Sequence, residues 1–323
     1  MTYRDRDRDG SRQPPLPKPY AFVPLPGGRI PLGKPAGHDR INVDLLHGTL
    51  HATLIARSPV HVASGLLEPR NDREHPLVKA HFRTGGRPAI PGTSLKGCMR
   101  SIVEAISPSA VHVTRSRDLP REYLPNRAVD RLDVVQRLFG AQGYQGQISF
   151  DDAMLQEGET QIHRSVQLHP PRENAQAAYA DGSTLKGRKF YMHGKPARGD
   201  LPLEVCPVGS RFALTLHFQN LAPGELGLLL FGLGLGSTHF CPKLGGAKPA
   251  CLGTIEVTEP HVRMSTPAER YSDFDDEAPA DAAIEPFLAE ARARGLVLGE
   301  QLDAIAAILR WPNDDRNCPD RSY

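Results

Sequence analysis

The chain of 323 residues lacks a strong net charge. Its 39 Lys and Arg residues nearly balance its 37 Asp and Glu residues, which leaves a formal net charge of +2. Bulk charge therefore provides no argument for a nucleic-acid partner, and any basic surface must be local. Hydrophobic residues make up 39% and charged residues 24%, which is ordinary for a globular protein long enough to bury a core.

The chain also lacks long apolar runs. None approaches the roughly 20 residues that a helix needs to span a bilayer. The N-terminal stretch "MTYRDRDRDGSRQPPLPKPY" is charged and rich in proline, with no apolar segment of the kind found in signal peptides. We therefore expect a cytoplasmic protein with no membrane partner.

Cysteine is scarce, and its five positions are odd in number and widely spaced: Cys98, Cys206, Cys241, Cys251 and Cys318. This pattern does not predict a disulfide framework. Four residues around the end of the chain's middle third could form a zinc site: Cys206, His239, Cys241 and Cys251. No C-x-x-C pair anchors them, so buried or free thiols are the alternative.

Three parts can be distinguished along the chain. Residues 1–47 predict an extended or disordered segment, and the proline-broken stretch within them is expected to lie on the body of the protein or on a neighbour. Residues 48–262 carry the patterns of one domain with an insertion at about 157–200, a polar and basic excursion. Residues 263–323 predict an acidic linker followed by helices.

Apolar periodicity locates the elements of the domain. Strands are expected at 48–62, 146–155, 210–220 and 252–262, and helices at about 94–106, 134–139 and from 223 onward. Residues 64–87 predict a polar loop, and 281–294 and 299–311 predict two amphipathic helices. The order favours an α+β fold: a ferredoxin-like (RRM-like) antiparallel sheet core with large insertions and a C-terminal helical hairpin.

The first chemical motif is "PGTSLKGCMRS", which begins the first expected helix. Thr93 or Ser94 can cap the free amides, and those amides with the helix dipole favour an anion. Gly97 removes a side chain, so a phosphate could approach closely. Lys96 and Arg100 lie four residues apart and share a helix face. The plain alternative is a solvated basic face with Arg100 paired to the acid that follows it by four residues, Glu104.

The second motif is a glycine-rich loop, "GLGLGSTHFCPKLGGAKPACLGTIEV", between a helix and the last strand. It carries Lys243 and Lys248. Gly245 and Gly246 would permit close approach of the backbone to phosphates. A flexible connection is the alternative.

Together the two motifs resemble the RAMP superfamily of CRISPR-associated RNA-binding proteins. In that family a G-x-S-x-K-G-x-x-R helix start follows the first strand, as Gly92, Ser94 (or Thr93), Lys96, Gly97 and Arg100 do here. The resemblance covers roughly residues 45–262. Two further stretches look like one branch of the superfamily: "PYAFVPLP" near the N-terminus and "LKGRKFYMHGKP" in the insertion.

The resemblance implies a guide-RNA-binding backbone subunit of a type III CRISPR ribonucleoprotein in antiviral defence. Its implied partners are the guide CRISPR RNA, the complementary target RNA and other subunits of the complex. Such subunits stack along the guide, and a hairpin called the thumb interrupts base pairing. The insertion at 157–200 is a candidate thumb, with charged and aromatic residues suited to RNA: Lys186, Arg188, Lys189, Phe190 and Tyr191. A solvated basic loop is the alternative.

The resemblance also implies a candidate site for cleaving target RNA. In family members that cut, an acidic residue in the loop after the first strand assists metal-dependent attack on a phosphate. Here Glu74 stands where the family has Asp, with Asp72 just before it, and magnesium would be the metal. No tightly bound cofactor is expected. His61 flanks the loop and could act as a base or contact RNA.

Two other functions stay open. One is a guide-processing or standalone ribonuclease of the same superfamily that uses a histidine such as His61. Processing members have two tandem ferredoxin-like units, whereas this sequence shows one core. The other is an accessory adaptor that docks through the C-terminal helices.

Overall fold

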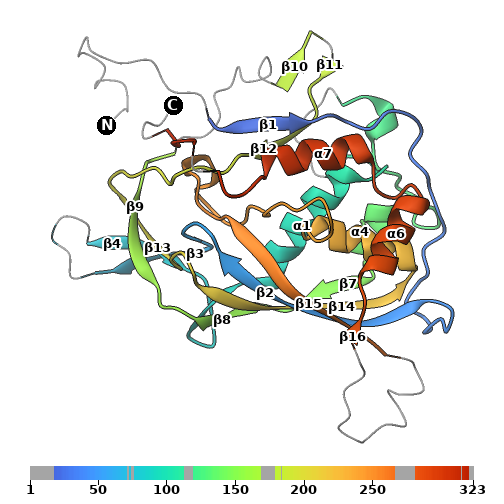
Figure 1. Cartoon of the computed structure of the whole chain (residues 1–323), viewed down its shortest axis with the longest axis horizontal. Coiled ribbons are helices and arrows are strands. Elements are labelled where there is room, and N and C mark those ends of the chain that lie inside the picture. The colour runs from blue at the N-terminus through green and yellow to red at the C-terminus, as the bar shows by residue number, and fades with distance from the viewer. Residues whose placement is uncertain are drawn as a thin grey trace, which may run out of the picture.

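In a computed structural model of the chain (Figure 1), the described residues are 18–70, 73, 76–112, 119–168, 179–182, 184–265, 281–313 and 315–319. The helices are α1 (Gly92–Ile106), α2 (Val134–Phe139), α4 (Pro223–Gly232), α6 (Glu285–Ala293) and α7 (Gly299–Ile308), with single turns η1 (Arg121–Tyr123) and η2 (Lys248–Ala250). The strands of the main sheet are β2 (Leu46–Ala56), β5 (Arg83–Thr84), β6 (Arg87–Ile90), β7 (Ile148–Phe150), β8 (Ala153–Glu157), β14 (Arg211–Leu221), β15 (Ile255–Met264) and β16 (Asp281–Ala282). The remaining strands are β1 (Tyr20–Val23), β3 (Ala63–Pro69), β4 (Leu77–His81), β9 (Gln161–Ser165), β10 (Ala180–Asp181), β11 (Thr184–Leu185), β12 (Arg188–Tyr191) and β13 (Leu201–Val205).

The main sheet has the strand order β16-β15-β2-β14-β8-β6-β5, and β7 also pairs with β14. Its centre, β15-β2-β14-β8, is antiparallel throughout. Helix α1 connects β2 to the β7–β8 side, and α4 connects β14 to β15. This is the βαββαβ connectivity of a ferredoxin-like fold, so the predicted α+β fold class is confirmed.

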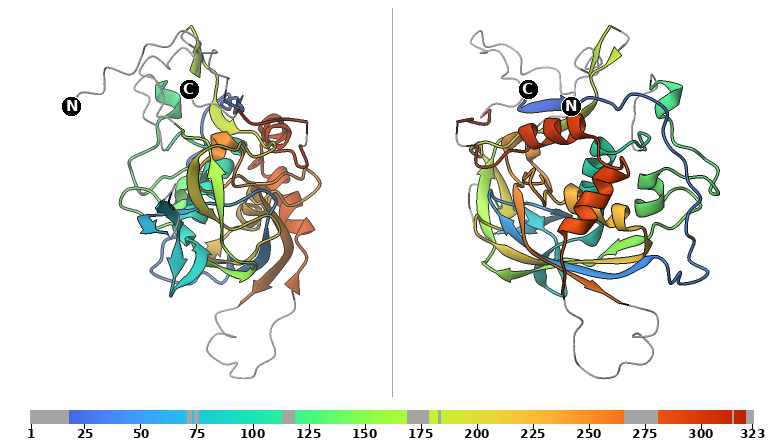
Figure 2. Two further views of the ribbon diagram at one scale, coloured as in Figure 1. Left: turned by 90° about the vertical axis from the view of Figure 1, so that its left-hand side faces the viewer. Right: turned by 45° about the vertical axis from the view of Figure 1, so that its right-hand side comes forward.

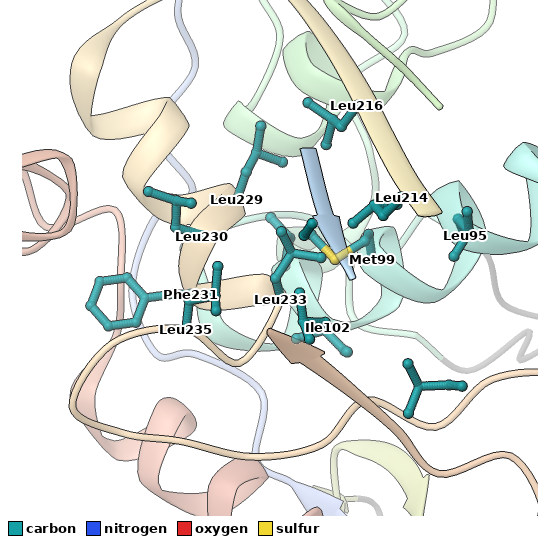
Figure 3. Close-up of a cluster of buried hydrophobic side chains, with 14 of the residues drawn as sticks. Leu95, Met99, Ile102, Leu214, Leu216, Leu229, Leu230, Phe231, Leu233 and Leu235 are labelled. Atoms are coloured by element: carbon teal, nitrogen blue, oxygen red, sulfur yellow. The ribbon is translucent and has the colours of Figure 1, made fainter. Parts of the chain in front are cut away.

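The core lies between this sheet and the helices that cover one of its faces (Figures 1 and 2). Side chains of β2 and β14 alternate between buried and more exposed along most of each strand, because successive residues of a strand point to opposite faces. Leu50, Leu54, Phe212 and Phe218 are at most 2% exposed. Figure 3 shows how α1 and α4 meet the sheet, with Met99 among leucines of both helices and of β14.

Two predicted elements differ from the structure. The loop expected at 64–87 contains β3 to β6, and its hairpin β3–β4 joins β13 and β9 in a second sheet of order β3-β4-β13-β9. The strand expected at 146–155 is two strands, β7 and β8, that bend at Asp151 and Asp152. Both errors arise because polar residues at a sheet edge or bend give no clean alternation.

The N-terminal segment lies on the body of the protein. Strand β1 pairs antiparallel with β12, with Tyr20 opposite Tyr191. The excursion at 157–200 is therefore not all loop, because β12 holds β1 and β9 belongs to the second sheet. Its role as a thumb stays a prediction.

The C-terminal helices complete the structure. Helix α6 packs on α4 and α7 packs on α1, with Leu302, Ile305 and Ile308 buried. A disulfide joins Cys251 to Cys318, so the expectation of unpaired cysteines is wrong for these two. Because the two cysteines are 67 residues apart, local spacing in the sequence could not predict this disulfide. Among the described helices, none has the length and apolar character needed to cross a membrane.

Candidate nucleic-acid interface

The N-terminus of α1 is closed by the sheet. Pro91 is the N-cap residue and makes no side-chain hydrogen bond to the helix, so the predicted cap by Thr93 or Ser94 is wrong. Instead the Gly92 amide donates a 2.8 Å hydrogen bond to Oδ1 of Asp152. A side chain at Gly92 would collide with the Phe150 carbonyl. The helix end therefore holds a carboxylate of the protein itself rather than lying open to a phosphate.

The side of α1 is open one turn later. A Cβ added at Gly97 would meet no atom within 4 Å. A glycine inside a helix destabilises the helix by about 1 kcal/mol relative to alanine, so Gly97 needs a structural or functional explanation. The open surface there supplies one, because a ligand backbone can come close to the helix.

Gly97 borders a cavity of about 550 Å³, which we call the first pocket. Helix α1, the glycine-rich loop and β12 form its walls through Ser94, Gly97, Ser101, Lys189, Tyr191, Lys243, Gly245, Gly246 and Lys248. Three segments that are distant in sequence thus bring predicted site residues together. Ser101 was not predicted, although its position four residues after Gly97 on the same helix face was a usable signal.

Lys243 lies at the wall of the first pocket and is only 6% exposed. Its Nζ donates a 2.9 Å hydrogen bond to the Met192 carbonyl, which uses one of an ammonium group's three donors. Burial, helped by Lys248 and Arg316, lowers the pKa of Lys243 to about 7. The charged groups that perturb it are all cations, so the pocket favours an anion.

The glycine-rich loop is held by the segment beneath it. The Gly246 amide donates a 2.7 Å hydrogen bond to the His61 carbonyl, and a side chain at Gly245, where φ is +82°, would strike that same carbonyl. His61 itself is 3% exposed, and its Nδ1 lies 2.7 Å from the Glu204 carbonyl. Burial lowers its pKa. The prediction that His61 contacts RNA or acts as a base is therefore wrong, because its ring is buried and already bonded.

Lys96 and Arg100 lie on the other side of α1. They line a second cavity of about 660 Å³, the second pocket, with His112, Asn126, Arg127 and Tyr144. Lys96 Nζ donates a 3.1 Å hydrogen bond to the Ile148 carbonyl. Arg100 Nε donates to Glu104 at 3.1 Å, which is the pairing that the plain alternative predicted. The helix therefore splits the predicted motif between two pockets.

The basic residues before and in β12 have separate environments. Lys186 pairs with Asp181 at 3.1 Å on the surface. Arg188 is largely buried, with an ion pair of 2.5 Å to Glu104, so its predicted RNA contact is wrong because the charge is enclosed. Lys189 donates a 2.7 Å hydrogen bond to the Tyr179 hydroxyl and lies 4.8 Å from the ring centroid of Tyr20.

The predicted zinc ligands do not gather. Cys251 is in the disulfide, and Cys206 Sγ lies 3.7 Å from His81 Nε2. Burial raises the pKa of Cys241 to about 12, and His239 Nδ1 lies 3.0 Å from the Gly234 carbonyl. Within the described ranges, no group of three or more His, Cys, Asp or Glu residues is arranged to hold a metal ion. The zinc prediction is therefore wrong.

The two carboxylates predicted for target cleavage, Asp72 and Glu74, lie outside the described residues. In the sequence they fall between β3 and β4.

An RRM-like sheet with a basic, glycine-walled pocket beside its first helix defines a class of α+β proteins suited to binding nucleic-acid backbones. The chain belongs to the RAMP superfamily, whose family model matches residues 53–241. The match includes α1 and ends before Lys243, so it covers only residues 232–241 of the glycine-rich loop and leaves out its two lysines. Membership supports a CRISPR-associated, RNA-binding protein. No curated protein matches the chain in sequence.

Proposed function

We infer that this protein is a guide-RNA-binding backbone subunit of a type III CRISPR ribonucleoprotein, and that the first pocket holds the RNA backbone. One observation carries the proposal: Lys243, Lys248 and Lys189 meet the bare surface of Gly97 in a single pocket. Superfamily membership supports binding to RNA in a complex with other CRISPR components. The assignment to a type III backbone rests on the two motifs.

The chemistry of the pocket fits a phosphodiester backbone. Buried or half-buried ammonium groups supply charge, and the Ser94 hydroxyl supplies a further donor, whereas the Ser101 hydroxyl already donates to the Gly97 carbonyl at 2.9 Å. Tyr191 at the wall supplies a ring on which a base can stack. Such contacts recognise single-stranded RNA without reading its sequence, as a scaffold along a variable guide requires.

The processing-enzyme alternative has less support. The described residues contain one ferredoxin-like unit, and the second sheet, β3-β4-β13-β9, has no helices of the ferredoxin pattern. His61 is buried, with a lowered pKa, and cannot reach a substrate.

The adaptor alternative relied on free C-terminal helices. In the structure α6 packs on α4 and α7 packs on α1, so the apolar sides of both helices are already covered.

The proposal is tested with a side chain that blocks the pocket without disturbing the fold. Gly97→Glu places a carboxylate in open space against the RNA path, and removing a helix glycine should raise the unfolding midpoint slightly. We expect binding of guide-length single-stranded RNA to be lost. Gly299→Glu is the matched control, because Gly299, the first residue of α7, likewise has no atom within 4 Å of an added Cβ and lies outside the first pocket lining.

The readout is RNA affinity together with the RNA that co-purifies with subunits from the native host. Unchanged affinity of Gly97→Glu would exclude the first pocket as the RNA site. Absence of guide-length RNA from the native complex would exclude the scaffold function itself.

A further inference from the structure

The second pocket holds cations that no carboxylate of the described residues neutralises. Glu104 and Asp133, which lie close to it, are already paired. Glu104 accepts from Arg100 and forms an ion pair with Arg188. Asp133 is 0% exposed, lies 3.0 Å from His112 Nε2, and accepts from the Gln136 amide at the start of α2.

Two cations of this pocket have no carboxylate partner among the described residues. Lys96 donates only to the Ile148 carbonyl, and burial together with Arg100 lowers its pKa. Arg127 is exposed at the rim of the cavity, in the segment after η1. A half-buried ammonium that faces a guanidinium and no acid is stabilised when an anion enters.

Between the two pockets, the surface of α1 has no side chain at Gly97. Ser94 and Ser101 border the first pocket, whereas Lys96 and Arg100 border the second. Gly97 lies between them with open space above it. A helix with side chains is about 10–12 Å across, and the missing side chain makes the crossing shorter there.

We propose that the second pocket is a phosphate-binding site for the same RNA strand, so that the strand crosses α1 over Gly97 with phosphates on both sides. Lys96 and Arg127 are the residues that bind phosphate in this pocket. The proposal rests on the proposed function, because it assumes that the first pocket holds RNA. It extends the RNA path onto residues 125–127, which neither motif contains.

The test is the double variant Lys96→Gln/Arg127→Gln. Each lost phosphate contact on a single strand lowers the slope of log affinity against log salt by about 0.7, so the double variant should lower it by about 1.4. Arg211→Gln is the matched control, because Arg211 lies on the sheet face opposite α1 with exposed acidic partners, and its slope should equal that of the wild type. Equal unfolding midpoints establish that each variant is folded.

RNA length separates the two pockets. An oligonucleotide of about 12 nucleotides can reach both pockets, whereas one of about 3 nucleotides can occupy only one. We expect the double variant to weaken the long RNA several-fold and to leave the short RNA unchanged, whereas Gly97→Glu weakens both. Equal affinity of wild type and double variant for the long RNA, with an unchanged salt slope, would overturn the second site. Failure of the wild type to bind either RNA would instead overturn the proposed function.

Discussion

The Gly92 amide and the Asp152 carboxylate meet at 2.8 Å, where the first helix starts and the β7–β8 bend ends. This hydrogen bond gives the helix a cap from a distant strand. It also explains why the open part of α1 is its side at Gly97 rather than its end. The carboxylate is further fixed by a 2.6 Å hydrogen bond from the Thr84 hydroxyl.

Asp152→Ala should destabilise the protein by about 1 kcal/mol, because it removes a helix cap. Asp152→Asn keeps an acceptor and should lose less. RNA affinity should stay the same in both, since the helix end is not part of the pocket. Urea unfolding and RNA titration measure the two effects. Asp151→Ala is the control, because Asp151 pairs only with the half-exposed His217. A large loss of RNA affinity in Asp152→Ala would contradict the closed helix end.

RNA binding should take up a proton at Lys243. Its pKa is about 7 in the free protein, against an ordinary value of 10.5, and a bound phosphate raises it again. Affinity should therefore fall as pH rises above about 7. Calorimetry at pH 8 in two buffers of different ionisation enthalpy measures the proton, and Lys243→Met should abolish it. The same proton uptake in Lys243→Met would assign it to another group.

The same variant should stabilise the free protein. A lysine whose folded pKa is lowered binds fewer protons folded than unfolded, so its destabilising effect is fully present below about pH 7 and disappears as pH rises toward 10.5. Lys243→Met should thus raise the unfolding midpoint at pH 6 more than at pH 10. A midpoint that rises equally at both would show that packing, rather than charge, is responsible.

Glu204 should support stability in acid. Burial by itself would raise its pKa, but hydrogen bonds from Arg83, the His81 amide and Thr160 outweigh it and lower the pKa to about 2. Because the folded pKa is lowered, this stability is present above the ordinary value of 4.5 and is lost as pH falls toward 2. Glu204→Gln should flatten that part of the pH curve of unfolding free energy. A curve that keeps its full fall between pH 4.5 and about pH 2 in Glu204→Gln would contradict this role.

The cleavage hypothesis predicts that Asp72→Asn and Glu74→Gln abolish magnesium-dependent cutting of target RNA in the assembled complex. Guide binding should persist, because the proposed binding of the guide rests on Lys189, Lys243 and Lys248, which these substitutions leave unchanged. Cleavage of a labelled target, with and without magnesium, is the measurement. Unchanged cutting at the position that this subunit contacts would remove both acids from the mechanism.

Local patterns predicted the elements of the core well. Strands β2 and β14 and helix α1 are each buried on one side. Such burial produces a regular apolar pattern among residues close together in the sequence, so the pattern can be recognised without the structure. The same patterns failed for β3 to β6, where much of the strand surface is exposed and the alternation is weak. Pairing of β13 with β4 and with β9 required contacts between segments far apart in the chain.

The roles predicted for the site residues stay predictions. Of the residues that the two motifs marked, the fold brings Gly97, Lys243 and Lys248 to one pocket. Lys248 lines that pocket, whereas Arg188 is largely buried in an ion pair with Glu104. Composition and residue spacing cannot distinguish these two environments. Arg127 belongs to neither motif, so no signal in the sequence marked it.

By itself, then, the sequence determined the α+β core and the two motifs, because both depend on residues close together in the chain. Only the tertiary structure decided which charges are available to a ligand. An ion pair such as Arg188 with Glu104, a cap such as Asp152 on Gly92, and a disulfide such as Cys251 with Cys318 depend on where distant segments meet. Burial lowers the pKa of Lys243 and makes its charge sensitive to a bound anion, and this burial exists only in the folded chain.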